Sequence, residues 1–165
     1  MAIMIKVSVT GIDKLAANLN NIAVKLRTEM KAANKKVGEY LEEATRRTFD
    51  MSGPGWKKLK QYTIDRKGHS TIMIDYGGYR GGINHKVTGN YEGEVFPDGP
   101  DYPRIDKHSL ALVHERGAVV ENGFRRGLRI VIPPRPVFQK TARRERVRVA
   151  GFYLRALRRA IGISV

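Results

Sequence analysis

The feature that most constrains the fold is a long stretch of helical periodicity that begins at Asp13 and runs to about Phe49. Apolar residues recur in steps of three and four, and no proline or glycine interrupts them before Gly38. This spacing predicts one amphipathic helix of about 35 residues, about 50 Å long. Its apolar positions are Leu15, Leu19, Ile22, Leu26, Met30, Ala33, Val37, Leu41 and Ala44.

Helices in globular proteins usually run to about 8–20 residues. The excess length leaves two interpretations open. Either the helix breaks or kinks near Gly38 and packs as an ordinary core helix, or it stays continuous and packs against neighbouring subunits.

Shorter elements are expected on either side of this helix. Ile5, Val7 and Val9 alternate with polar residues, which is typical of a short strand at the N-terminus. The glycine and proline at 52–55 break the helix, and a loop with Trp56 then leads into a short helix. Short apolar runs between glycine-rich turns predict a small, mainly antiparallel sheet. These runs are residues 71–74, 81–83, 91–96, 110–113 and 128–132.

The order of elements is strand, long helix, small sheet and C-terminal helix, which predicts an α+β fold. At 165 residues the chain fits a single domain. Within it, residues 1–50 form the strand and long helix, 51–136 the sheet, and 137–165 a basic helix. Two polar insertions, near 97–108 and 117–127, are expected to be mobile loops that order against a partner.

Charge is concentrated at the C-terminus. The chain has 31 basic and 16 acidic residues, for a net charge of +15, and residues 137–165 alone hold 8 basic and 1 acidic residue. Such an excess predicts a polyanion or an acidic protein surface nearby. A helical wheel gathers six cations within about 100°, with the packing side chains broadly opposite, Ala142 and Leu157 among them. The basic face consists of Lys140, Arg144, Arg148, Arg155, Arg158 and Arg159.

No catalytic or cofactor-binding constellation is present in the sequence. The four histidines, His69, His85, His108 and His114, lack metal-binding spacing, and there is no cysteine to supply a thiolate. Glu92 and Glu94 alternate in one expected strand but have no third acid in pattern. The sequence has no phosphate-binding loop and no nucleophile elbow. We therefore expect neither an enzyme nor a cofactor.

Two kinds of negatively charged partner are possible for the basic helix. One is DNA, whose phosphates arginines neutralise in a salt-dependent way. The other is an acidic surface on another protein. No helix-turn-helix, RNP-like strand or zinc module is visible, so any contact with DNA would be non-specific. The chain also lacks an apolar window long enough for a membrane span and a recognisable export signal, which favours the cytosol as its place of synthesis.

Several short motifs, in their order along the chain, resemble the virion-morphogenesis and tail-completion proteins of tailed bacteriophages. Residues 49–59 resemble a helix end, a Gly/Pro loop and a Trp-x-x-Leu element. Residues 72–80 resemble an apolar strand running into a turn, although Tyr76 stands where the family has threonine. Residues 112–117 resemble its H-E-x-G element at a strand end, and 132–138 its I-P-x-R-P element before the last helix. The positions that carry this likeness are Trp56, Leu59, Thr63, Gly78, His114, Gly117, Pro133, Arg135 and Pro136.

The resemblance implies a non-enzymatic subunit of a neck or tail-completion ring that joins the head connector to the tail. A hexamer is expected, with a dodecamer as the alternative. Its partners would be further copies of itself, the connector, tail-terminator or tube proteins, and DNA passing through the channel. Its location would be the virion, after assembly in the host cytoplasm. The alternative from another class is a basic protein that binds nucleic acid without sequence preference.

Overall fold

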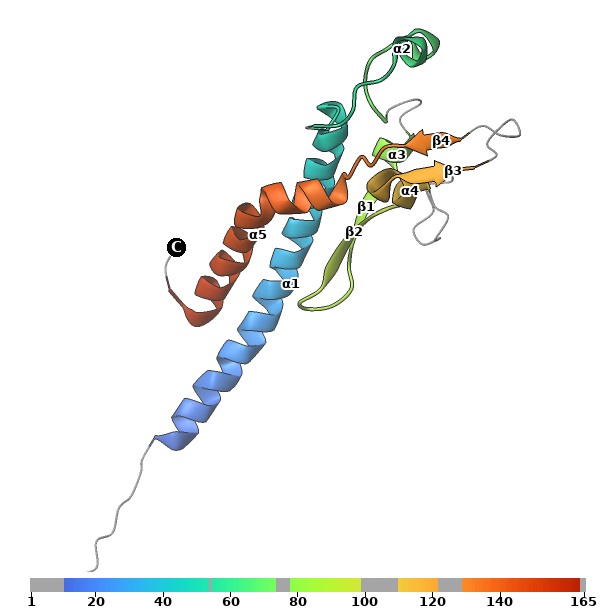
Figure 1. Ribbon diagram of the computed structural model, residues 1–165. Helices are drawn as coiled ribbons and strands as arrows, with labels where there is room; N and C mark the ends of the chain where they lie inside the picture. Colours follow the sequence, from blue (N-terminus) through green and yellow to red (C-terminus); the bar gives the residue numbers. More distant parts are fainter. Residues whose placement is uncertain (1–10, 54, 74–77, 99–109, 122–128, 164–165) are drawn as a thin grey trace, which may run out of the picture.

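The computed structural model describes residues 11–53, 55–73, 78–98, 110–121 and 129–163 (Figure 1). Its helices are α1 (Ile12–Asp50), α2 (Gln61–Lys67), α3 (Gly78–Gly81), α4 (Leu110–Arg116) and α5 (Phe138–Ile161). Its strands are β1 (Ile83–Val87), β2 (Gly93–Pro97), β3 (Ala118–Val120) and β4 (Ile130–Ile132). The α+β fold predicted from the sequence is confirmed.

Helix α1 is continuous over 39 residues, about 58 Å at 1.5 Å per residue. Of the two interpretations left open, the break at Gly38 does not occur. This glycine allows a close contact instead. A Cβ atom there would lie 2.6 Å from the His85 ring, so only glycine lets β1 approach the helix this closely. The helix ends at Asp50, where the backbone N–H of Gly53 donates to the carbonyl of Thr48.

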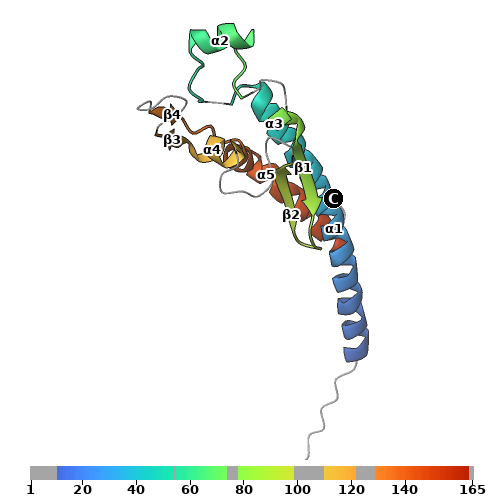
Figure 2. The ribbon, with the colours of Figure 1, turned by 90° about the vertical axis from the view of Figure 1, so that its right-hand side faces the viewer.

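Helix α5 packs antiparallel along the C-terminal half of α1. Its start meets the end of α1, where Thr141 and Thr48 share a hydrogen bond of 2.8 Å. Its end reaches Glu29, to which Arg159 donates at 2.6 Å. The N-terminal half of α1 therefore extends beyond α5 and away from the rest of the molecule, as both views of the ribbon show (Figures 1 and 2). The predicted C-terminal helix is confirmed.

The strands form two separate antiparallel pairs, where the sequence predicted one small sheet. In the first pair Ile83 lies opposite Pro97 and Val87 opposite Gly93, and the hairpin packs on α1. In the second pair Ala118 lies opposite Ile132. Strand β3 occupies part of the insertion at 117–127 that was expected to be a loop.

Two of the expected strands are wrong, and the one expected at 81–83 is misplaced, because Gly81 ends α3 and only Ile83 belongs to β1. Residues 110–113 belong to helix α4, since a short apolar run satisfies either periodicity and leucine and alanine favour a helix. Residues 71–73 form a turn in which Met73 has a φ of 61°, which an extended strand does not permit. Glu92 precedes β2, so only Glu94 belongs to that strand. The N-terminal strand, Ile74 and most of both predicted loops lie outside the described residues.

The apolar core lies at the C-terminal end of α1. Phe49 is fully buried and meets Tyr79 and Trp56 edge to face, with ring centroids 4.9 and 6.4 Å away. Ile72, Ile83, Ala111 and Val137 complete the cluster. The core thus joins the end of the long helix to the starts of α3, α4 and α5, the elements that carry the sequence motifs.

Candidate functional site

The H-E-x-G and I-P-x-R-P elements lie against each other at the start of α5. Glu115, at the end of α4, accepts hydrogen bonds from the backbone N–H groups of Val137, Phe138 and Gln139, at 2.7, 3.4 and 2.9 Å. These N–H groups have no partner within the helix, and a carboxylate at a helix N-terminus also meets the positive end of the helix dipole. The glutamate of the H-E-x-G element is therefore the N-terminal cap of α5.

Backbone contacts join the same two segments. The N–H of Arg135 donates to the carbonyl of His114 at 2.6 Å. Gly117 has a φ of +76°, and a Cβ there would lie 2.9 Å from the carbonyl oxygen of Ile132 and 3.0 Å from Pro134. The glycine is therefore required both by its conformation and by the close approach of the neighbouring chain. We call this arrangement of residues 114–117 and 132–139 the motif junction.

Two basic side chains, those of His114 and Arg135, are partly buried at the motif junction. His114 is half-buried and stacks on Tyr79, with ring centroids 6.2 Å apart. Burial, and secondarily the Arg135 guanidinium, lowers the pKa of His114, and burial lowers that of Arg135. An imidazole beside a cation is favoured in its neutral form, so His114 has a packing role there.

Removing the Glu115 cap should destabilise the protein. Glu115→Ala leaves three backbone donors without their acceptor, and we expect a loss of about 1–2 kcal/mol in the free energy of unfolding, measured by urea denaturation. Glu115→Gln retains one acceptor oxygen and should lose less. Glu121→Ala is the matched control, since Glu121 is exposed and should change stability by about 0.5 kcal/mol or less. Equal losses for the variants at 115 and 121 would contradict the capping role.

His114 should make stability depend on pH. Because its folded-state pKa is lowered, the unfolded chain takes up a proton more readily than the folded one. Its contribution is therefore complete above about pH 6.5, the usual histidine pKa, and is lost as the pH falls towards the folded-state value. Urea unfolding between pH 8 and pH 5 should show a steeper decline for the wild type than for His114→Gln. Parallel curves would show that His114 does not contribute to the dependence of stability on pH.

Three residues of the predicted basic face of α5 bind α1. Arg144 donates to the carbonyl of Ala44 at 3.3 Å, Arg148 to the hydroxyl of Tyr40 at 3.1 Å, and Arg159 to Glu29 at 2.6 Å. The Arg155 guanidinium lies 4.9 Å from the centre of the Phe152 ring. Arg158 is exposed, and Lys140 is half-buried and in contact with the rest of the chain. Arg144, Arg148 and Arg159 thus hold the two helices together within one copy of the chain.

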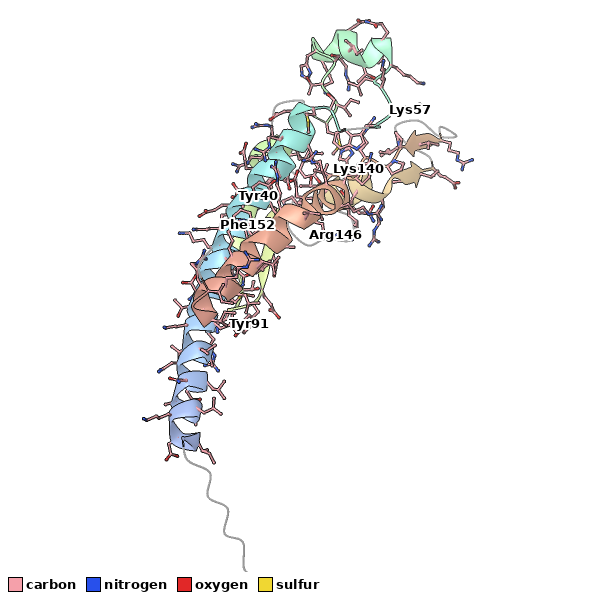
Figure 3. All side chains as sticks on the ribbon, turned by 90° about the vertical axis from the view of Figure 1, so that its left-hand side faces the viewer. Tyr40, Lys57, Tyr91, Lys140, Arg146 and Phe152 are labelled. Carbon is pink, nitrogen blue, oxygen red and sulfur yellow. The ribbon has the colours of Figure 1, made fainter. Side chains whose placement is uncertain are left out.

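The buried face of α5 is more polar than the helical wheel indicated. Thr141 and Glu145 are buried against α1, whereas Ala142 and Leu157, expected to pack, are exposed. The Tyr40 hydroxyl donates to Glu145 and, with Arg144, holds the pKa of that carboxyl below its usual range. Figure 3 shows Tyr40 and Phe152 facing each other between the helices, with ring centroids 5.6 Å apart. Sequence reasoning missed Glu145, although it is the single acid among the basic residues of this segment.

The other residues of the resemblance lie apart from the motif junction. Trp56 is in the core and Leu59 packs against it. Thr63 is half-buried on α2, which stands away from the other helices at one end of the molecule (Figure 1). Gly78 begins α3. Pro133 and Pro136 are half-buried in the segment that leads from β4 to α5.

Two of the cavities along α1 differ in character. One, of about 190 Å³, is mainly apolar, lies between α1, β2 and α5, and is smaller than the roughly 300–1,000 Å³ of sites for small organic ligands. The other, of about 660 Å³, is an open groove between α1 and the tip of the β1–β2 hairpin. Its charged lining is Arg27, Lys31 and Lys35. This groove suits a negatively charged neighbour and contains no nucleophile paired with a base.

Large apolar side chains are exposed on both long helices. On the free half of α1, Ile12, Leu15 and Leu19 are 56–60% exposed. On α5, Val147 is 78% and Leu154 56% exposed. Exposed apolar side chains that recur along one helix face indicate a surface for another protein.

In the part of the chain that the structure describes, no three histidine or carboxylate side chains lie close enough together to hold a metal ion. None of the helices described combines the length and apolar character that crossing a membrane requires. No protein-family model, curated protein or solved structure matches the chain.

Proposed function

We propose that this chain is a structural subunit of a tailed-bacteriophage neck or tail-completion ring that joins the head connector to the tail during virion assembly. The observation that carries an assembly role is the exposed apolar surface on α1 and α5, which one copy leaves open to water. The phage assignment rests on the order of the sequence motifs. In support of it, the H-E-x-G and I-P-x-R-P elements form one junction that sets the start of α5.

The role needs no catalysis. Among the described residues, the two cavities along α1 considered above lack a paired nucleophile and base, and the contacts of the motif junction are capping and close packing. The ring would be a hexamer, with a dodecamer as the alternative. Its other partners would be the connector, tail-terminator or tube proteins, and its location the virion. The cationic groove of Arg27, Lys31 and Lys35 suits an acidic surface of such a partner or the DNA in the channel.

A nonsense mutation in the gene for this chain tests the proposal. We expect filled heads and separate tails that fail to join, visible by electron microscopy and restored by supplying the protein in trans. In wild-type particles, mass spectrometry should find the chain at a fixed copy number. Joined, infectious particles from the mutant at the wild-type yield would refute the proposal.

The second candidate is a nucleic-acid-binding protein without sequence preference, favoured by the same cationic groove. Titration with a random DNA duplex at rising salt distinguishes the two. Submicromolar affinity at physiological salt with a steep salt dependence would favour this candidate. Triple replacement of Arg27, Lys31 and Lys35 with glutamine should then remove most of the binding.

A further inference from the structure

An apolar seam runs along the free half of α1. It consists of Ile12, Leu15, Leu19, Ile22 and Leu26, in steps of three, four, three and four residues. The first three are exposed and the last two half-buried. We call these residues the α1 seam. It continues the face of α1 that is buried further along the helix at Ala33 and Val37.

A stripe with the same spacing runs along α5. It consists of Val147, Ala150, Leu154, Leu157 and Ile161, all of which are exposed. We call these residues the α5 stripe. It spans 15 residues, as the α1 seam does, so each face is about 21 Å long at 1.5 Å per residue. Both have the spacing by which helices interlock side chains in coiled coils.

The two faces cannot meet within one chain. The face of α5 that contacts α1 carries Thr141, Glu145, Ala156 and Ala160, all buried, and the α5 stripe lies on another side of the helix. Moreover, α5 ends close to Glu29, which binds Arg159, so the exposed part of the α1 seam, Ile12, Leu15 and Leu19, lies beyond the end of its own α5. No helix or strand among the described residues covers either face.

We propose that the α1 seam of one copy packs against the α5 stripe of a second copy. Spacing and length agree, and α1 would use one continuous face for both contacts, its C-terminal half on its own α5 and its N-terminal half on the neighbour's. One kind of contact then covers both exposed apolar surfaces.

Charge disfavours one symmetric alternative, and uncovered apolar surface disfavours the other. Arg143, Arg146 and Arg158 flank the α5 stripe and are exposed, so pairing α5 with α5 would bring like charges together. By contrast, Ala16, Asn18 and Ala23 flank the α1 seam without charge, and Lys25 is the charged residue beside it. Pairing α1 with α1 brings this lysine of each copy near the interface but leaves both α5 stripes exposed. The α1–α5 contact covers both apolar faces and does not set the three arginines of one copy against those of another.

This contact is head-to-tail, because each copy offers a different surface to each neighbour. Such contacts generate rings when the rotation between copies closes, and open filaments when it does not. The inference deepens the proposed function by naming the surfaces that would build the ring. The closing of the ring rests on that function, whereas the contact between two copies does not.

Complementary charge variants test the contact. Leu19→Asp disables the α1 seam and Leu154→Asp the α5 stripe, and both residues are 56% exposed, so the fold should be retained. By light scattering after size exclusion, each variant alone should be monomeric at concentrations where the wild type assembles. A one-to-one mixture should form heterodimers that grow no further, because one intact seam and one intact stripe remain. Asn21→Asp, an exposed change away from the seam, should assemble like the wild type.

Several outcomes would overturn the inference. They are a monomeric wild type, self-association of Leu154→Asp alone through α1, self-association of Leu19→Asp alone through α5, and a mixture that stays monomeric. Circular dichroism verifies folding, and Leu15→Asp with Val147→Asp gives a second pair at residues 60% and 78% exposed. A wild type that assembles as described but is absent from virions would refute the proposed function and leave the contact standing.

Discussion

Replacing Phe49 with alanine is expected to lower the free energy of unfolding by about 3–5 kcal/mol. The side chain is fully buried at the centre of the core, where its ring meets Trp56 and Tyr79 edge to face. Truncation removes apolar contacts and leaves a cavity that two rigid aromatic rings cannot readily fill. Because these rings come from the segments on either side of α2, the loss should affect the whole C-terminal end of α1.

Met51→Ala is the matched control, since Met51 lies two residues away and is 59% exposed. It should change stability by about 0.5 kcal/mol or less. Urea unfolding followed by circular dichroism measures both variants, and the fluorescence of Trp56 reports directly on the core. A loss below about 1 kcal/mol for Phe49→Ala would mean that the core is not organised around this ring.

The long elements of the fold could be predicted from the sequence because their signal is repeated. Helix α1 satisfies the helical period over many turns, and α5 follows a proline-rich entry that sets its start. The short elements could not, since a run such as residues 110–113 contains too few positions to distinguish a strand from a helix. The separation of the strands into two pairs depends on tertiary packing, which no local pattern encodes.

The motif residues could be selected from the sequence, but their roles could not. Glu115 caps a helix whose first residue lies 23 positions further along the chain, so the contact exists only in the folded protein. Likewise, the wheel for α5 grouped its cations on one face but could not show that some of them bind α1. Polar residues such as Thr141 and Glu145 are buried there through hydrogen bonds to Thr48 and Tyr40. Hydrophobicity carries no signal for such pairing.

Gly117→Ala is expected to lower the free energy of unfolding by about 2–5 kcal/mol. The left-handed conformation at φ +76° costs a residue with a Cβ about 1–2 kcal/mol. The added methyl group would also lie 2.9 Å from the carbonyl oxygen of Ile132, and separating the two segments costs a further 1–3 kcal/mol or so. Urea denaturation measures the total.

Gly162→Ala separates these two causes. Gly162 ends α5 at φ +78°, nearly the same conformation, but a Cβ there meets nothing within 4 Å. It should therefore lose only the conformational part, about 1–2 kcal/mol. The difference between the two variants measures how tightly the motif junction holds β3 against the entry to α5. Equal losses would mean that the two segments can separate freely, and the start of α5 would then depend on the Glu115 cap alone.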